Sequence, residues 1–221
     1  MLSALGPLLP IAVAVAVSSV PIMATILILL SPKRNQSAIP FLIGWVVGMA
    51  AVVVIAAVGA NALPVRPFRA QQKAIAIGQI VVGIALLLAA VLAWRRAARS
   101  PKDRGNGWLG RIDRVGPVAA LGLAFALNLR PKALLLGAAA GLSIAGSSLK
   151  AADAAVVVAI YVGLAASTVI VPIVVTLVAP ARMKPRLVLA RDWLSQNSAH
   201  ITVVVLVMVG FVILGAGLSK L

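Results

Sequence analysis

Long apolar segments alternate with short, basic gaps along the whole chain. Six of these segments are long enough to cross the roughly 30 Å hydrocarbon core of a bilayer as helices. They cover residues 5–30, 39–63, 74–94, 115–147, 151–179 and 201–218. This pattern predicts an all-α membrane protein with six transmembrane helices.

Two of the six segments are interrupted near their middle by proline and polar residues. The first break is residues 18–21 (Ser-Ser-Val-Pro), and the second break is residues 128–132 (Asn-Leu-Arg-Pro-Lys). A proline inside a helix frees a backbone carbonyl, which needs another partner within the membrane. We expect the side chains of Ser18, Ser19 and Asn128 to supply that partner.

Each broken segment opens a group of three, so one arrangement occurs twice. We assign residues 1–94 to a first three-helix repeat, 95–116 to a basic cytoplasmic loop and 117–221 to a second repeat. Three spans per repeat is an odd number, so the second repeat enters the membrane from the opposite side. The sequence therefore predicts two inverted three-helix repeats, the first helix of each being broken. Matching breaks in two halves point to a transporter-like site near the bilayer midplane.

The basic residues predict the orientation. The chain has 221 residues, is 62% hydrophobic and carries a net charge of +16, with a mean hydropathy of +1.13. Of its 20 lysines and arginines, 13 follow the first, third and fifth spans, five lie on the opposite side, and two lie in the second break. Because this excess marks the cytoplasmic side, we predict a multi-pass plasma (inner) membrane protein with both termini outside. If residues 115–147 formed two spans, 11 basic residues would lie on one side of the membrane and 9 on the other, which is a weaker asymmetry.

Tryptophan positions agree with these spans. Trp94 and Trp193 fall at predicted inner boundaries, Trp108 in the central loop and Trp45 in the first turns of its span, as an interfacial belt would place them. Most basic residues lie in the gaps between spans, where anionic lipid headgroups favour positive charge. We therefore predict no nucleic-acid partner.

Two cations stand within the fourth segment. A charge at the bilayer centre costs about 2.5–3.5 kcal/mol on insertion scales, yet Arg130 and Lys132 are two residues apart. One hypothesis is that they meet the anionic group of a ligand. The alternative is that they reach the outer interface or pair with Asp153, and the sequence leaves both open.

Few other residues could take part in catalysis or bind a metal ion. The chain has no cysteine, one histidine and four acidic residues, all aspartates in predicted loops or at span ends. We therefore expect no cofactor, no metal site, no catalytic residue and no enzyme activity. The candidate substrate-binding residues are those of the two breaks: Ser18, Ser19, Pro21, Asn128, Arg130, Pro131 and Lys132.

Two further patterns concern packing and the membrane surface. Gly44 with Gly48 and Gly137 with Gly141 match the small-xxx-small spacing of closely approaching helices, which fits packing within the chain and a homodimer equally. Between residues 183 and 197, basic and apolar residues interleave, which is typical of a helix in the membrane interface.

The motifs resemble a known family. Residues 18–24 and 41–48 are similar to the first repeat of the actinobacterial sulfolipid- and peptidoglycolipid-addressing proteins, part of the lysine-exporter superfamily. Residues 128–136 resemble the Asn-Pro-Lys element that opens the family's second repeat, and residues 192–197 the pattern before its last span. The likeness covers essentially the whole chain. One difference is that Leu129 and Arg130 separate the asparagine from Pro131-Lys132.

This resemblance implies a six-span membrane protein that helps move complex glycolipids to the cell surface alongside large lipid transporters. Our leading hypothesis is export or addressing of such a glycolipid, with membrane lipids, an anionic glycolipid and a large lipid transporter as partners. Two alternatives stay open: a lysine-exporter-type exporter of a small solute such as an amino acid, and a non-transporting scaffold subunit of a lipid-transport complex. The scarcity of intramembrane carboxylates disfavours a proton-coupled relay.

Overall fold

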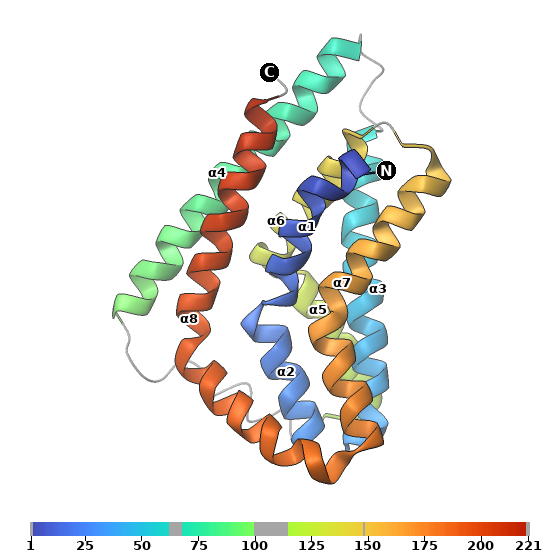
Figure 1. Ribbon diagram of the computed structural model, residues 1–221, viewed down its shortest axis with the longest axis vertical. Coiled ribbons are helices and arrows are strands. Elements are labelled where there is room, and N and C mark those ends of the chain that lie inside the picture. Colours follow the sequence, from blue (N-terminus) through green and yellow to red (C-terminus); the bar gives the residue numbers. More distant parts are fainter. Residues whose placement is uncertain (1, 62–67, 100–114, 148, 220–221) are drawn as a thin grey trace.

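The computed structural model describes residues 2–61, 68–99, 115–147 and 149–219, and every regular element in these ranges is an α-helix (Figure 1). The eight helices are α1 (Leu2–Ala16), α2 (Ser19–Leu30), α3 (Arg34–Asn61), α4 (Phe68–Arg99), α5 (Pro117–Asn128), α6 (Pro131–Ala145), α7 (Ala151–Val178) and α8 (Pro180–Leu218). The prediction of an all-α protein is confirmed for this part of the chain.

Four of these helices, α3, α4, α7 and α8, are long and apolar enough to cross a membrane. The pairs α1–α2 and α5–α6 also qualify when each is counted together, bent by 46° and 67° respectively. The described part of the chain thus has four clear spans, and six if each bent pair is one span. Both sequence-predicted breaks are confirmed as the points where these pairs bend.

The bent pairs run in opposite directions. In Figure 1, α1–α2 descends from the end where the chain starts, whereas α5–α6 rises toward that end, where α7 begins. The α2–α3 and α7–α8 connections, both flanked by basic residues, lie together at the opposite end of the bundle. Each half of the chain therefore consists of a bent pair followed by two long helices.

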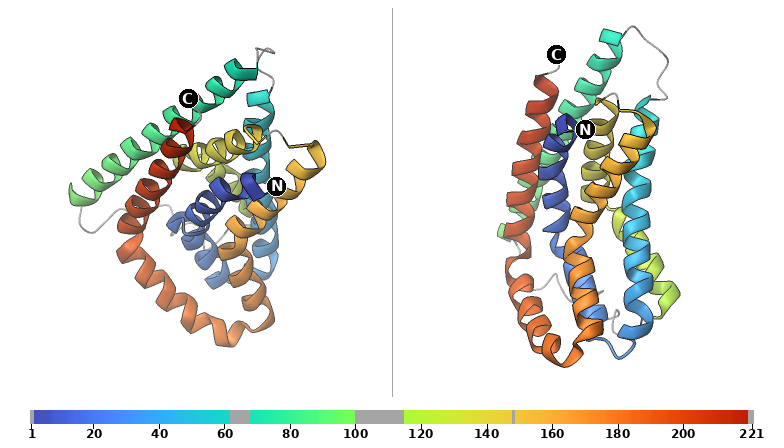
Figure 2. Two further views of the ribbon diagram at one scale, coloured as in Figure 1. Left: turned by 45° about the horizontal axis from the view of Figure 1, so that its top comes forward. Right: turned by 45° about the vertical axis from the view of Figure 1, so that its right-hand side comes forward.

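Helix α8 is longer than the span predicted from residue 201. It begins at Pro180 and crosses the end of the bundle beneath α2 before turning up beside α4 (Figure 1). Both views of Figure 2 show α8 running along α4. Helix α4 extends to Arg99, into the segment assigned to the basic loop, and residues 100–114 of that loop lie outside the described residues.

Glycines let α3 hold both halves of the second bent pair. A Cβ on Gly48 would stand 2.8 Å from the Asn128 side chain, which ends α5, and one on Gly141 of α6 would stand 2.8 Å from the Ala57 backbone. Because no side chain fits at either place, α5 and α6 lie directly against α3. These glycine pairs are explained by packing within the chain, and the homodimer stays a prediction without support from them.

The outer surface is apolar. Exposed side chains on several helices are aliphatic, among them Ile55 at 71%, Val118 at 83% and Val178 at 80%. In water such a surface would favour aggregation, whereas lipid tails accept it. With the length of the helices, this identifies a multi-pass membrane protein.

The tryptophans only partly follow the sequence prediction. Trp94 and Trp193 are 66% and 60% exposed, as expected of boundary residues, and Trp108 lies outside the described residues. The prediction for Trp45 is wrong, because its side chain is 2% exposed. Helix α3 begins at Arg34, so Trp45 lies about 16 Å along it, well inside the span.

Candidate functional site

The two breaks lie at the same level of the bundle. From the end with the α2–α3 connection, the first break is reached after α2 and the second after α5, both 12 residues long. From the other end, the corresponding helices α1 and α6 both have 15 residues. At 1.5 Å per residue, each break is about 18 Å from one end and about 22 Å from the other. The breaks therefore meet deep within the span.

At the first break, a neighbouring helix supplies the hydrogen bond. The Thr168 hydroxyl of α7 donates to the Ala16 carbonyl at the end of α1, at 2.6 Å, and Thr25 Oγ1 donates to the Pro21 carbonyl at 2.8 Å. Ser18 caps α2 with its backbone only, and the Ser19 hydroxyl lies 3.5 Å from that of Thr202. The expectation that the two serines satisfy the loosened backbone is wrong.

At the second break, the asparagine does satisfy backbone carbonyls. Asn128 Nδ2 donates to the Ala124 carbonyl of its own helix at 3.1 Å and to the Trp45 carbonyl of α3 at 3.3 Å. The side chain is 4% exposed. Asn128 thus ends α5 and ties it to α3, which holds the break in place.

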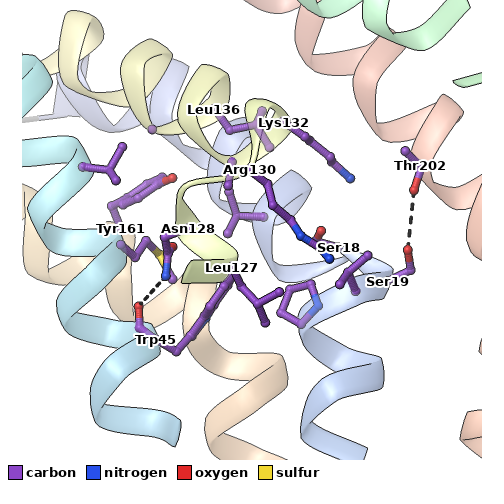
Figure 3. A pocket seen from close by; sticks show the side chains of 17 residues that line it. Ser18, Ser19, Trp45, Leu127, Asn128, Arg130, Lys132, Leu136, Tyr161 and Thr202 are labelled. Atoms are coloured by element: carbon purple, nitrogen blue, oxygen red, sulfur yellow. Dashed lines mark hydrogen bonds between the residues drawn. The ribbon is translucent and has the colours of Figure 1, made fainter. Parts of the chain in front are cut away.

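A cavity of about 200 Å³ lies between the breaks (Figure 3). Six of the seven candidate residues line it, while Pro131 is exposed and is not among the lining residues. The lining also includes apolar side chains from α1, α3, α5 and α6. The polar and charged part consists of Ser18, Ser19, Asn128, Arg130, Lys132, Trp45, Tyr161 and Thr202. None of the lining residues is acidic.

Two of the lining residues carry buried polar atoms without a protein partner. Trp45 Nε1 and the Tyr161 hydroxyl make no hydrogen bond in the part of the chain that is described, although both side chains are only 2% exposed. The Tyr161 hydroxyl points toward the α5–α6 break (Figure 3). Buried polar groups are nearly always paired in proteins, so these two donors lack a partner that a ligand or water would provide.

Sequence reasoning did not find these two residues. Trp45 was assigned to the interface, and Tyr161 was not among the candidate site residues, because nothing in their local sequence distinguishes them. One sequence feature could have indicated that Trp45 is buried. It follows Gly44 directly, and that glycine brings α3 close to α5.

The two cations project into different parts of the cavity. The Arg130 side chain extends toward Ser18 of the first break, and the Lys132 amine extends toward α8 (Figure 3). Asp153 forms no ion pair with any residue that the structure describes. The alternative in which Asp153 pairs with these cations is therefore wrong. Within the described ranges, no three histidine, cysteine or acidic residues lie close enough together to hold a metal ion.

Comparison with known proteins gives one match. The family model described as "Sap, sulfolipid-1-addressing protein" matches residues 8–219, which is nearly the whole chain. The chain belongs to this family. No curated protein and no solved structure shows a significant match.

Membership of the sulfolipid-1-addressing family confirms the resemblance carried by the break motifs. It also agrees with the multi-pass helical structure, since a protein that addresses a membrane lipid works in or at the bilayer. The matched region includes both bent pairs except the first residues of α1, and it includes every residue that lines the cavity.

Proposed function

We propose that the cavity binds the anionic group of a complex glycolipid, and that the protein assists export or addressing of this lipid to the cell surface. The observation that carries the proposal is the meeting of two helix breaks deep in the span, where Arg130 and Lys132 line one cavity with no acidic residue. Charges at such a position are costly and generally mark a substrate pathway.

The donors around the cavity favour an oxyanion. Arg130 and Lys132 are donors without acceptor capacity, and the indole of Trp45 is a donor only. A sulfate, phosphate or carboxylate offers several acceptor oxygens to such a set. Charge-assisted hydrogen bonds are about twice as strong as neutral ones, and the apolar residues of the lining reduce competition from water. These properties support recognition of an anionic headgroup.

The size of the cavity supports binding of a headgroup rather than of a whole lipid. Its volume of about 200 Å³ is below the roughly 300–1,000 Å³ of sites that enclose a drug-sized ligand. In the proposed mode, the anionic group enters the cavity while the acyl chains stay in the surrounding lipid. The apolar outer surface of the bundle is compatible with such chains.

The opposite directions of the two bent pairs support an inverted repeat as the basis of transport. Repeats of this kind alternate access to a fixed midplane site by rocking one half against the other. We propose this mechanism, with the basic connections in the cytoplasm, both termini outside and the protein in the plasma membrane. A large lipid transporter would act with it, and no enzyme chemistry is involved.

The test is lipid profiling of the cell surface in a deletion strain complemented with variants. The double variant R130Q/K132Q is expected to lower the surface amount of the anionic glycolipid at least tenfold. The matched control R182Q/R186Q removes the same charge from exposed residues of α8 and is expected to leave the surface lipid unchanged. Normal surface lipid with R130Q/K132Q would overturn the proposal.

Export of a small solute is the second candidate, because an amino acid also fits a cavity of about 200 Å³. Reconstituted vesicles that accumulate a labelled amino acid would favour it. If instead only deletion of the basic loop abolishes surface glycolipid, and R130Q/K132Q does not, the protein is a scaffold subunit of a lipid-transport complex.

A further inference from the structure

A second cavity lies at the opposite end of α2 from the breaks. It has a volume of about 340 Å³ and is lined by residues of the α2–α3 connection and by one residue of α8. The lining residues are Leu29, Leu30, Ser31, Pro32, Arg34, Asn35 and Lys184. Two cations that are far apart in the sequence therefore share one cavity, and none of the residues lining it is acidic.

The cavity has buried residues at its floor and exposed residues at its rim. Leu29 is 1% exposed and Ser31 is 5% exposed, whereas Asn35 and Lys184 are exposed. The Nε of Arg34 donates to Asn35 Oδ1 at 3.4 Å. That bond orients the guanidinium through Nε, so its two terminal nitrogens form the edge that would meet an oxyanion in a bidentate manner.

The surrounding helix places this cavity at the membrane surface. The first turns of α8 bury Leu187 and Leu194, each 4% exposed, against the bundle, while Leu189 and Trp193 are 71% and 60% exposed. Interleaved basic residues and exposed Leu and Trp suit the interface between headgroups and tails, where tryptophan and positive charge are both favoured. Lys184 is thus held at headgroup level beside the end of a span.

We propose that this second cavity binds a phosphate group at the inner face of the membrane through Arg34 and Lys184. Two like charges repel, and a phosphate that bridges them replaces that repulsion with attraction. Basic pockets between membrane helices on the cytoplasmic side are a recognised place for anionic lipid headgroups. The group would join the α2–α3 connection to α8 and fix the end of α2 whose other end lines the first cavity.

The test uses the full-length protein in detergent and fluorescently labelled phosphatidylglycerol, with labelled phosphatidylcholine as the zwitterionic reference. Wild-type protein is expected to bind phosphatidylglycerol at least tenfold more tightly than phosphatidylcholine. The variant R34Q/K184Q is expected to lose this preference, and R182Q/R186Q, with the same change in charge, to keep most of it. If R34Q/K184Q does not fold, K184Q alone is expected to reduce the preference severalfold.

Inorganic phosphate distinguishes the two sources of the ligand group. Full competition by millimolar phosphate identifies a site for free phosphate, and its failure to compete identifies a lipid headgroup. Equal losses in R34Q/K184Q and R182Q/R186Q would overturn the proposal, because they would indicate diffuse surface attraction. Absence of any preference in the wild type would also overturn it. Neither readout depends on glycolipid export, so this site and the proposed function fail separately.

Discussion

The two breaks are alike in position and unlike in chemistry. Both bend a span between segments of 12 and 15 residues. The first is uncharged and depends on Thr168 of another helix for a hydrogen bond to its carbonyl. The second supplies its own amide, Asn128, and adds two cations. The comparison teaches that a bend alone forms a cavity wall, whereas the ligand preference that we propose for the cavity depends on the charges of the second break.

The largest expected effect comes from placing a negative charge on the neutral break. In S18D, the new carboxylate would face Arg130 and act in place of the ligand. Each lost charged hydrogen bond is worth about 1.5–3 kcal/mol, so we expect about a hundredfold weaker binding of a sulfated glycolipid. The matched variant S18N keeps the size without the charge and is expected to bind within a few-fold of wild type. Equal affinities of S18D and S18N would show that the two breaks do not share a site.

The next effect concerns how the charged break is held against α3. In G141A, the added Cβ would stand 2.8 Å from the backbone of Val53 and Ala57. Overpacking of this kind costs about 1–3 kcal/mol, and we expect a clear fall in the Tm of the protein in detergent. Gly163 has nothing within 4 Å, so G163A should leave Tm unchanged or raise it. A similar Tm for the two variants would contradict the close packing of α6 on α3.

A smaller effect is expected for the hydrogen bond that holds the neutral break. T168V removes the donor to the Ala16 carbonyl, and an unpaired buried group costs about 1–3 kcal/mol. We expect a moderately lower Tm. The Ser167 hydroxyl donates to the Leu164 carbonyl of its own helix and is partly exposed, so S167A is the control. If S167A lowers Tm as much as T168V, α7 does not support the first break.

The smallest effect separates binding from stability. The Tyr161 hydroxyl has no partner among the described residues, so Y161F removes a buried polar atom at no cost in hydrogen bonds. We expect an equal or higher Tm together with about fivefold weaker binding of the sulfated glycolipid, as loss of one hydrogen bond of about 1 kcal/mol implies. A lower Tm with unchanged affinity would assign the hydroxyl a structural role.

Sequence patterns predicted the spans and the breaks because these depend on local properties. Run length, proline and embedded charge determine where a membrane helix forms and where it bends. The partners across the bundle were not predictable in this way. Thr168, Trp45 and Tyr161 reach the breaks only through the packing of α3 and α7, which no local pattern of residues records.

Helix boundaries showed the same distinction. An interfacial helix was predicted from interleaved basic and apolar residues, but its continuity with the last span as the single helix α8 was not predicted. Continuity depends on contacts with α2 and α4 (Figure 1). The glycine pairs likewise predicted close helix packing but not the packing partner, which is a helix from the other half of the chain.

The most direct test of the central claim is the affinity of the purified protein for a sulfated glycolipid and for the same lipid without its sulfate. If Arg130 and Lys132 bind the anionic group, wild-type protein will prefer the sulfated lipid by at least tenfold, and R130Q/K132Q will bind both equally. An unchanged preference in that variant would contradict the account.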